Sequence, residues 1–106
     1  STPPPRDELA RADTAIKQAE QSGATEHAPA ELREAKTQYD QANLILRSKN
    51  EDKYPDARRL AERAVADAQL AATLARAKRA ETIAGEVYQG VETLQKELDR
   101  PTGGAQ

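Results

Sequence analysis

The sequence has no cysteine, methionine, tryptophan or phenylalanine, and its only aromatic residues are three tyrosines. Because cysteine is absent, these 106 residues form no disulfide and carry no thiol chemistry. Both oxidising and reducing compartments therefore remain open. No apolar run approaches the roughly 20 residues of a membrane span. The formal net charge of −2 at pH 7 gives no electrostatic reason to expect a nucleic acid as partner.

Groups that catalyse reactions are equally scarce. His27 is the only histidine and stands in an expected loop beside Glu26, whereas a zinc site needs three or four ligands. The three serines, Ser1, Ser22 and Ser48, lack a neighbouring base and the Gly-x-Ser-x-Gly context of an activated nucleophile. No glycine-rich loop is placed to hold a phosphate. The sequence therefore predicts a protein that is not an enzyme and that has no metal and no cofactor.

Small helix-forming residues are abundant instead. The chain has 21 alanines and nine leucines, 32% charged residues and a mean hydropathy of −0.90. Alanine buries little area, so the core is expected to be thin and to suit helices packed closely along their length. Such polarity also favours disorder, but apolar residues recur at helical spacing along most of the chain.

The longest uninterrupted helical stretch runs from Pro55 to Asp99. Proline is favoured in the first turn of a helix, and Pro101 with the glycines after it forms a stop signal. One continuous helix here would be about 65 Å long, which is longer than an 11.5 kDa globule needs. The helix is therefore expected to protrude or to bend. Gly85 and Gly90 mark a candidate kink, and a fold-back near Gly90 is a lesser alternative.

Two shorter helices precede it. The first is expected at Arg6–Ser22, with Gly23 as the residue that ends it. A loop at 24–28 then leads to a second helix at Pro29–Ser48 and a polar turn at 49–54. Asn50 is a natural helix-ending residue in that turn, and Pro55 favours an extended Tyr54. The apolar stripes of the two helices are Leu9, Ala12, Ile16 and Ala19, and then Leu32, Ala35, Tyr39, Ala42, Ile45 and Leu46.

The first half of the long helix carries two apolar faces. One face contains only alanine, and the nearly opposite face also contains leucine. The second helix is suited to be the antiparallel hairpin partner. Two faces predict two neighbours, of which the first helix could supply one and a second copy of the chain the other. The faces are Ala57, Ala61, Ala64, Ala68, Ala72 and Ala75, and Ala66, Leu70, Leu74 and Ala77.

These patterns predict an all-α fold of three helices, with an antiparallel helical hairpin and one long, partly protruding C-terminal helix. Residues 1–5, STPPP, are expected to be an extended proline-rich tether with no means of burying itself. Residues 6–100 form a single alanine-rich helical domain, and 101–106 a flexible tail.

The second half of the long helix carries bulkier apolar residues than the first half. They form a candidate self-association seam, because an uncovered apolar ridge is seldom tolerated on a soluble monomer. The segment from Pro55 to Arg79 contains six basic and three acidic residues, a net charge of +3. The segment from Ala80 to Arg100 contains two basic and five acidic residues, a net charge of −3. This division favours an antiparallel homodimer, although a solvated surface with a chance imbalance also accounts for it. The seam residues are Ile83, Val87, Val91, Leu94 and Leu98.

One concentration of positive charge lies in the first half of the same helix. It is a candidate basic face for anionic lipid headgroups or carboxylates, or simply a solvated helix surface. No aromatic residue is interleaved for base stacking, which counts against single-stranded nucleic acid. Its members are Arg58, Arg59, Arg63, Arg76, Lys78 and Arg79.

From Ala28 to Glu81 the chain resembles an alanine-rich helical domain-of-unknown-function family (DUF-type, 4398) of bacterial envelope lipoproteins, sometimes found ahead of OmpA-like domains. The family pattern reads A-P-x-E-L-x-x-A, a polar turn, then Y-x-x-A-x-x-L-A-x-x-A-x-x-D-A. The usual glycine before the tyrosine is replaced here by Asp52-Lys53. The matching residues are Ala28, Pro29, Glu31, Leu32 and Ala35, and then Tyr54, Ala57, Leu60, Ala61, Ala64, Asp67 and Ala68.

The resemblance implies a location in the periplasm, tethered to the outer membrane by a lipidated cysteine directly before STPPP. The expected function is a non-catalytic scaffold or adaptor that acts through helix–helix contacts. The expected partner is an envelope protein or a peptidoglycan-associated partner. The alternative is a ligand- or peptide-binding helical module that uses the basic face of the long helix.

Overall fold

The computed structural model describes residues 2–101, and every regular secondary-structure element in that range is helical. Its elements are α1 (Arg6–Gln21), the single turn α2 (Ala24–His27), α3 (Pro29–Ser48), the 3₁₀ turn η1 (Glu51–Lys53) and α4 (Tyr54–Asp99). The all-α fold predicted from the sequence is confirmed. Ser1 and all but the first residue of the predicted tail lie outside the described range.

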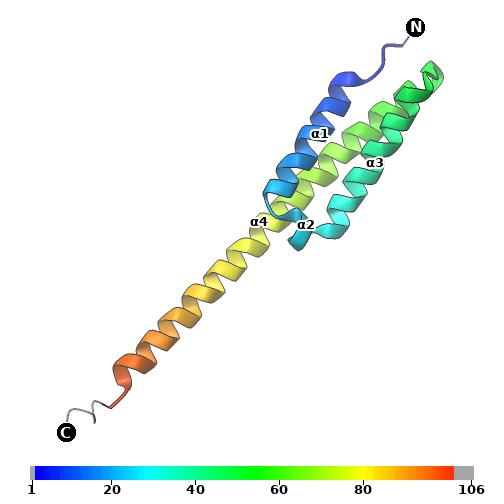
Figure 1. Cartoon of the computed structure of the whole chain (residues 1–106). Helices are drawn as coiled ribbons and strands as arrows, with labels where there is room; N and C mark the ends of the chain where they lie inside the picture. Colours follow the sequence, from blue (N-terminus) through cyan, green and yellow to red (C-terminus); the bar gives the residue numbers. More distant parts are fainter. Residues whose placement is uncertain (1, 102–106) are drawn as a thin grey trace.

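The helices form a short bundle with one long extension. Figure 1 shows α1 and α3 along the N-terminal half of α4, with α3 antiparallel to α4 and α1 running in the same direction as α4. Beyond them α4 continues alone, so the molecule measures 89 × 15 × 13 Å. The predicted hairpin and protruding helix are both confirmed.

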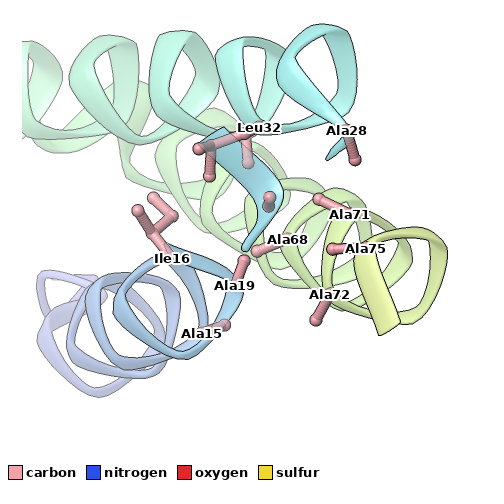
Figure 2. Close-up of a cluster of buried hydrophobic side chains, with 11 residues drawn as sticks. Ala15, Ile16, Ala19, Ala28, Leu32, Ala68, Ala71, Ala72 and Ala75 are labelled. Carbon is pink, nitrogen blue, oxygen red and sulfur yellow. The ribbon is translucent and has the colours of Figure 1, made fainter. Parts of the chain in front are cut away.

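Alanine lets the three helices approach closely. On α4 the bundle side carries alanine at every predicted position, and each of these side chains is buried. Figure 2 shows three of them, Ala68, Ala72 and Ala75, close to Ala15 and Ala19 of α1. A small side chain at each contact allows the helix axes to lie close together and gains dispersion contacts between backbones.

Few large side chains complete the core. Leu9 and Ile16 of α1 and Leu32 of α3 are the large aliphatic residues that are buried among the described residues. They belong to two apolar clusters, and Tyr39 of α3 packs against both. A core made mostly of methyl groups buries little area per residue, so each of these three residues contributes a large share of the total.

The connections differ from the expected loops in detail. The segment expected as a loop at 24–28 contains one helical turn, α2, and Ala24 of that turn is buried. Gly23 ends α1 as predicted, in the left-handed region at φ 92°. After α3 the left-handed residue is Lys49, at φ 58°, and the predicted Asn50 is extended instead.

Tyr54 and Pro5 differ from expectation, whereas Pro55 lies in the first turn of α4 as predicted. Tyr54 is the first residue of α4, with helical angles of φ −60° and ψ −37°, although Pro55 disfavours that geometry. The side chain of Tyr54 is buried in the bundle, and this packing offsets the steric preference. Pro5 is fully buried against the start of α1, so the proline-rich segment is exposed only over its earlier residues.

The long helix neither kinks nor folds back. α4 is one continuous α-helix from Tyr54 to Asp99, and Figure 1 shows it straight through the region of Gly85 and Gly90. Neither glycine has a neighbouring atom within 4 Å of the position of a Cβ. The low helix propensity of these two glycines therefore does not change the geometry of α4.

Replacing Gly23 by alanine is expected to lower the free energy of unfolding by about 2 kcal/mol. Alanine resists the left-handed conformation, and its Cβ would lie 2.9 Å from Nε of Arg79, whose guanidinium covers this turn. Urea denaturation followed by tyrosine fluorescence measures the change.

Gly85→Ala is the matched control, because it places the same methyl group in open space on α4. We expect that variant to gain helicity without losing stability. Equal stability of the Gly23 and Gly85 variants would contradict the role assigned to Gly23.

Candidate helix–helix interface

The part of α4 beyond the bundle, here called the overhang, comprises residues 76–99. Every one of these residues is exposed. The cause is simple: α1 ends at Gln21 and α3 begins at Pro29, so neither helix reaches past the level of Ala75. Isolated helices draw little stability from propensity alone, and packing normally supplies the rest. The overhang lacks that packing within its own chain.

The predicted seam lies entirely on the overhang. Its most covered residue, Val91, is 51% exposed, and its least covered, Leu98, is 77% exposed. Tyr88 is also largely exposed. Spaced at three and four residues, the seam side chains form one apolar ridge along the helix. The structure thus brings the five seam residues together on one side of the helix and covers none of them.

Among residues 2–101, no other helix packs on the second apolar face of α4 either. We expected the first helix or a second copy to cover it, but α1 packs on the same alanine side as α3. Leu70 and Leu74 remain 48% and 40% exposed, and Ala66 and Ala77 are exposed too. Alanine explains the difference, because its small side chains let two helices share one side of α4.

The six residues of the predicted basic face do not gather into one site. They are spread over about 30 Å of α4 and point in several directions around it. Arg58 pairs with Glu8 of α1 at 3.5 Å, Arg59 with Asp56, and Lys78 with Glu81 at 3.9 Å.

The other three residues of the basic face also differ in surroundings. Arg76 lies at the groove between α1 and α4, and Arg79 covers Gly23. Arg63 is exposed on α4. The arrangement therefore offers separate cations, not one anion-binding surface.

The remaining titratable side chains that we describe form local surface pairs. His27 is half-buried, more covered than a loop position predicts, and its Nε2 lies 3.8 Å from the carboxylate of Glu26. Asp13 accepts a hydrogen bond from Lys17 and raises the pKa of that ammonium, aided by its negative charge. Within residues 2–101 no three His, Asp or Glu side chains are grouped to hold a metal ion, and no helix there is long and apolar enough to cross a membrane.

The sequence from residue 7 to residue 87 matches a protein family described as Domain of unknown function (DUF4398). The match covers the whole bundle and the first half of the overhang. This chain belongs to the DUF4398 family. No curated protein and no solved structure matches the chain.

Membership extends further than the motif resemblance did. The motif residues of this DUF4398 domain lie between Ala28 and Glu81, whereas the family match begins within α1. All three helices of the bundle are therefore part of the family's domain. The match also includes Ile83 and Val87 of the seam.

Proposed function

We propose that this DUF4398 domain is a non-catalytic periplasmic scaffold or adaptor of an outer-membrane lipoprotein, acting through helix–helix contacts made by the overhang. The supporting observation is that the seam is exposed on the part of α4 that extends beyond the bundle. An apolar ridge of this length on a soluble protein marks an interaction site. A partner helix would cover it and supply the packing that the overhang lacks.

The location rests on a different observation. The stretch from Ala28 to Glu81 resembles domains of bacterial envelope lipoproteins, and the burial of Pro5 fixes where the proline-rich segment meets the bundle. The partner is accordingly an envelope protein or a peptidoglycan-associated partner. The alternative function, ligand binding by the basic face, has less support because three of its six cations already pair with carboxylates.

Photo-crosslinking in cells tests this function. With p-benzoylphenylalanine at Val91, irradiation is expected to give a covalent adduct that fractionates with the cell envelope. With the same probe at Gln89, the yield should be at least about fivefold lower, because two residues turn the side chain about 200° around the helix. Immunoblots of envelope and cytosolic fractions measure both.

The two positions form a matched pair, because both side chains are exposed and the two residues are only two positions apart on α4. Equal crosslinking yields at the two positions would show that the seam is not the interface. Adducts confined to the cytosolic fraction would remove the periplasmic location.

A further inference from the structure

We infer that the seam is one end of a longer apolar stripe on the outer face of α4, the side turned away from α1 and α3, and that this stripe pairs with the same stripe of a second copy in antiparallel orientation. This inference rests on the proposed function, because it names the partner of the same surface. Three features of the stripe carry it: continuity, the order of side-chain sizes, and charge.

The stripe is continuous from the bundle to the tip of α4. Starting at Leu70, apolar or small residues recur at alternating steps of three and four, which is the heptad spacing of a coiled coil. Every member of the stripe is exposed. The bundle-facing residues Ala68, Ala71 and Ala75 lie on roughly the opposite side of the helix. A second helix can therefore lie along the stripe clear of α1 and α3 over the overhang, and it meets the edge of α1 only at Thr73, which lines a groove with Ala15 and Gln18.

Side-chain size divides the stripe into two halves. The half nearer the bundle is small: Thr73, Ala77, Ala80 and Ala84. The half nearer the tip is bulky: Val87, Val91, Leu94 and Leu98. A parallel pair would place alanine opposite alanine over three layers and leave voids there. An antiparallel pair places a small residue opposite a bulky one in every layer, which is how facing positions fill a core.

One antiparallel register pairs each of the four small residues with one of the four bulky residues. With the two-fold axis between Gly85 and Glu86, Ala84 packs against Val87 of the second copy, and each further layer follows by the same symmetry. Outside the central layers, Ile83 then lies beside Gly90 of the second copy, which has no side chain to obstruct it. Glycine is unfavourable within a single helix, but Gly90 makes room here for Ile83 of the second copy.

Charge favours the same register. Arg76 lies beside Glu97 of the second copy, and symmetry repeats that pair at the other end of the interface. Within the paired segment, residues 73–85 carry three bases and one acid, a balance of +2, and they face residues 86–98 of the second copy, where three acids and one base give −2. A parallel pair would place like charges side by side, which opposes association. The occupant that the surface fits best is therefore its own copy.

The footprint predicts a weak, concentration-dependent dimer. The paired segment, 73–98, is about 39 Å long, and a helix is about 10 Å wide. Each copy therefore contributes roughly 400 Å², which is at the small end of specific interfaces. Association is expected in the range from about 10 μM to about 1 mM, so the measurements must cover it.

Sedimentation equilibrium of the full chain at low salt tests the pairing. The wild type is expected to dimerise across that range. Arg76→Glu should weaken the dimer about tenfold, because it places glutamate beside Glu97 at both ends of the interface. Arg76→Glu combined with Glu97→Arg should restore the affinity to within about threefold. A wild type that stays monomeric near 1 mM, or a double variant no tighter than the single one, overturns the inference.

Spin labels test the orientation separately. The chain has no cysteine, so one introduced cysteine carries the only label. In the antiparallel register, labels at Lys96 are separated by roughly 32 Å along the axis and labels at Gln89 by roughly 10 Å. Pulsed electron paramagnetic resonance measures both distances in the dimer. Equal, short distances at the two positions would indicate a parallel pair and overturn the inference.

The two proposals fail in different ways. A monomeric wild type together with a Val91 adduct heavier than two copies of the chain would keep the scaffold function and remove the homodimer. Loss of the seam-specific adduct in cells, with a dimer in solution, would remove the scaffold function and keep the pairing.

Discussion

Ala68→Leu is expected to lower the free energy of unfolding by about 3 kcal/mol, enough to unfold a large fraction of so small a bundle. Ala68 is fully buried where α1, α3 and α4 meet, close to Ala19 (Figure 2). A leucine there must push the helices apart, and every neighbouring alanine contact on α4 is lost with it. Urea denaturation followed by tyrosine fluorescence measures the loss, since Tyr39 and Tyr54 report from the bundle.

Ala66→Leu is the control for that experiment. Ala66 lies two residues away on the exposed side of the same helix, so the same three carbons are added in water. Its effect is expected to stay within about 0.5 kcal/mol. A comparable loss of stability in both variants would show that the close approach of the helices at Ala68 is not what holds the bundle together.

Leu32→Ala is expected to lower the free energy of unfolding by about 3 kcal/mol, because it leaves a cavity in the core and does not overpack it. Leu32 is buried in α3 and fills space that alanines from α1, α2 and α4 leave open (Figure 2). Removing it leaves a cavity in a core that has few large side chains to move into it. The midpoint of urea denaturation is expected to fall without a change in the slope of the transition.

Leu44→Ala provides the matched change on α3. The side chain of Leu44 is 63% exposed, so the same deletion removes little buried area. We expect its free energy of unfolding to stay close to that of the wild type. If Leu32→Ala behaves like Leu44→Ala, the assignment of Leu32 to the core is wrong.

Much of this fold could be predicted because its signals are local. Helix bounds followed from proline and glycine positions, and the bundle side of α4 followed from alanines spaced at three and four residues. The seam was visible for the same reason, since it lies on one continuous helix whose geometry fixes which residues share a side. Its pairing partner remains a prediction.

What the sequence missed depended on tertiary contacts. Tyr54 was expected to be extended because Pro55 disfavours helix, but burial of its side chain in the bundle outweighs that preference. The neighbour of Leu70 was misjudged because two helices share the alanine side of α4, and helical periodicity cannot show how many helices one side will accept. The basic face was grouped by sequence proximity, which ignores direction around the helix.

The elongated shape has a mechanical consequence. The start of α1 lies at the bundle end of the molecule, and the tip of α4 lies near the opposite end, along a long axis of 89 Å (Figure 1). A continuous helix curves only gently over such a length. The chain is therefore a strut of fixed reach: whatever is attached before α1 is kept nearly the full length of the molecule away from whatever binds at Leu98.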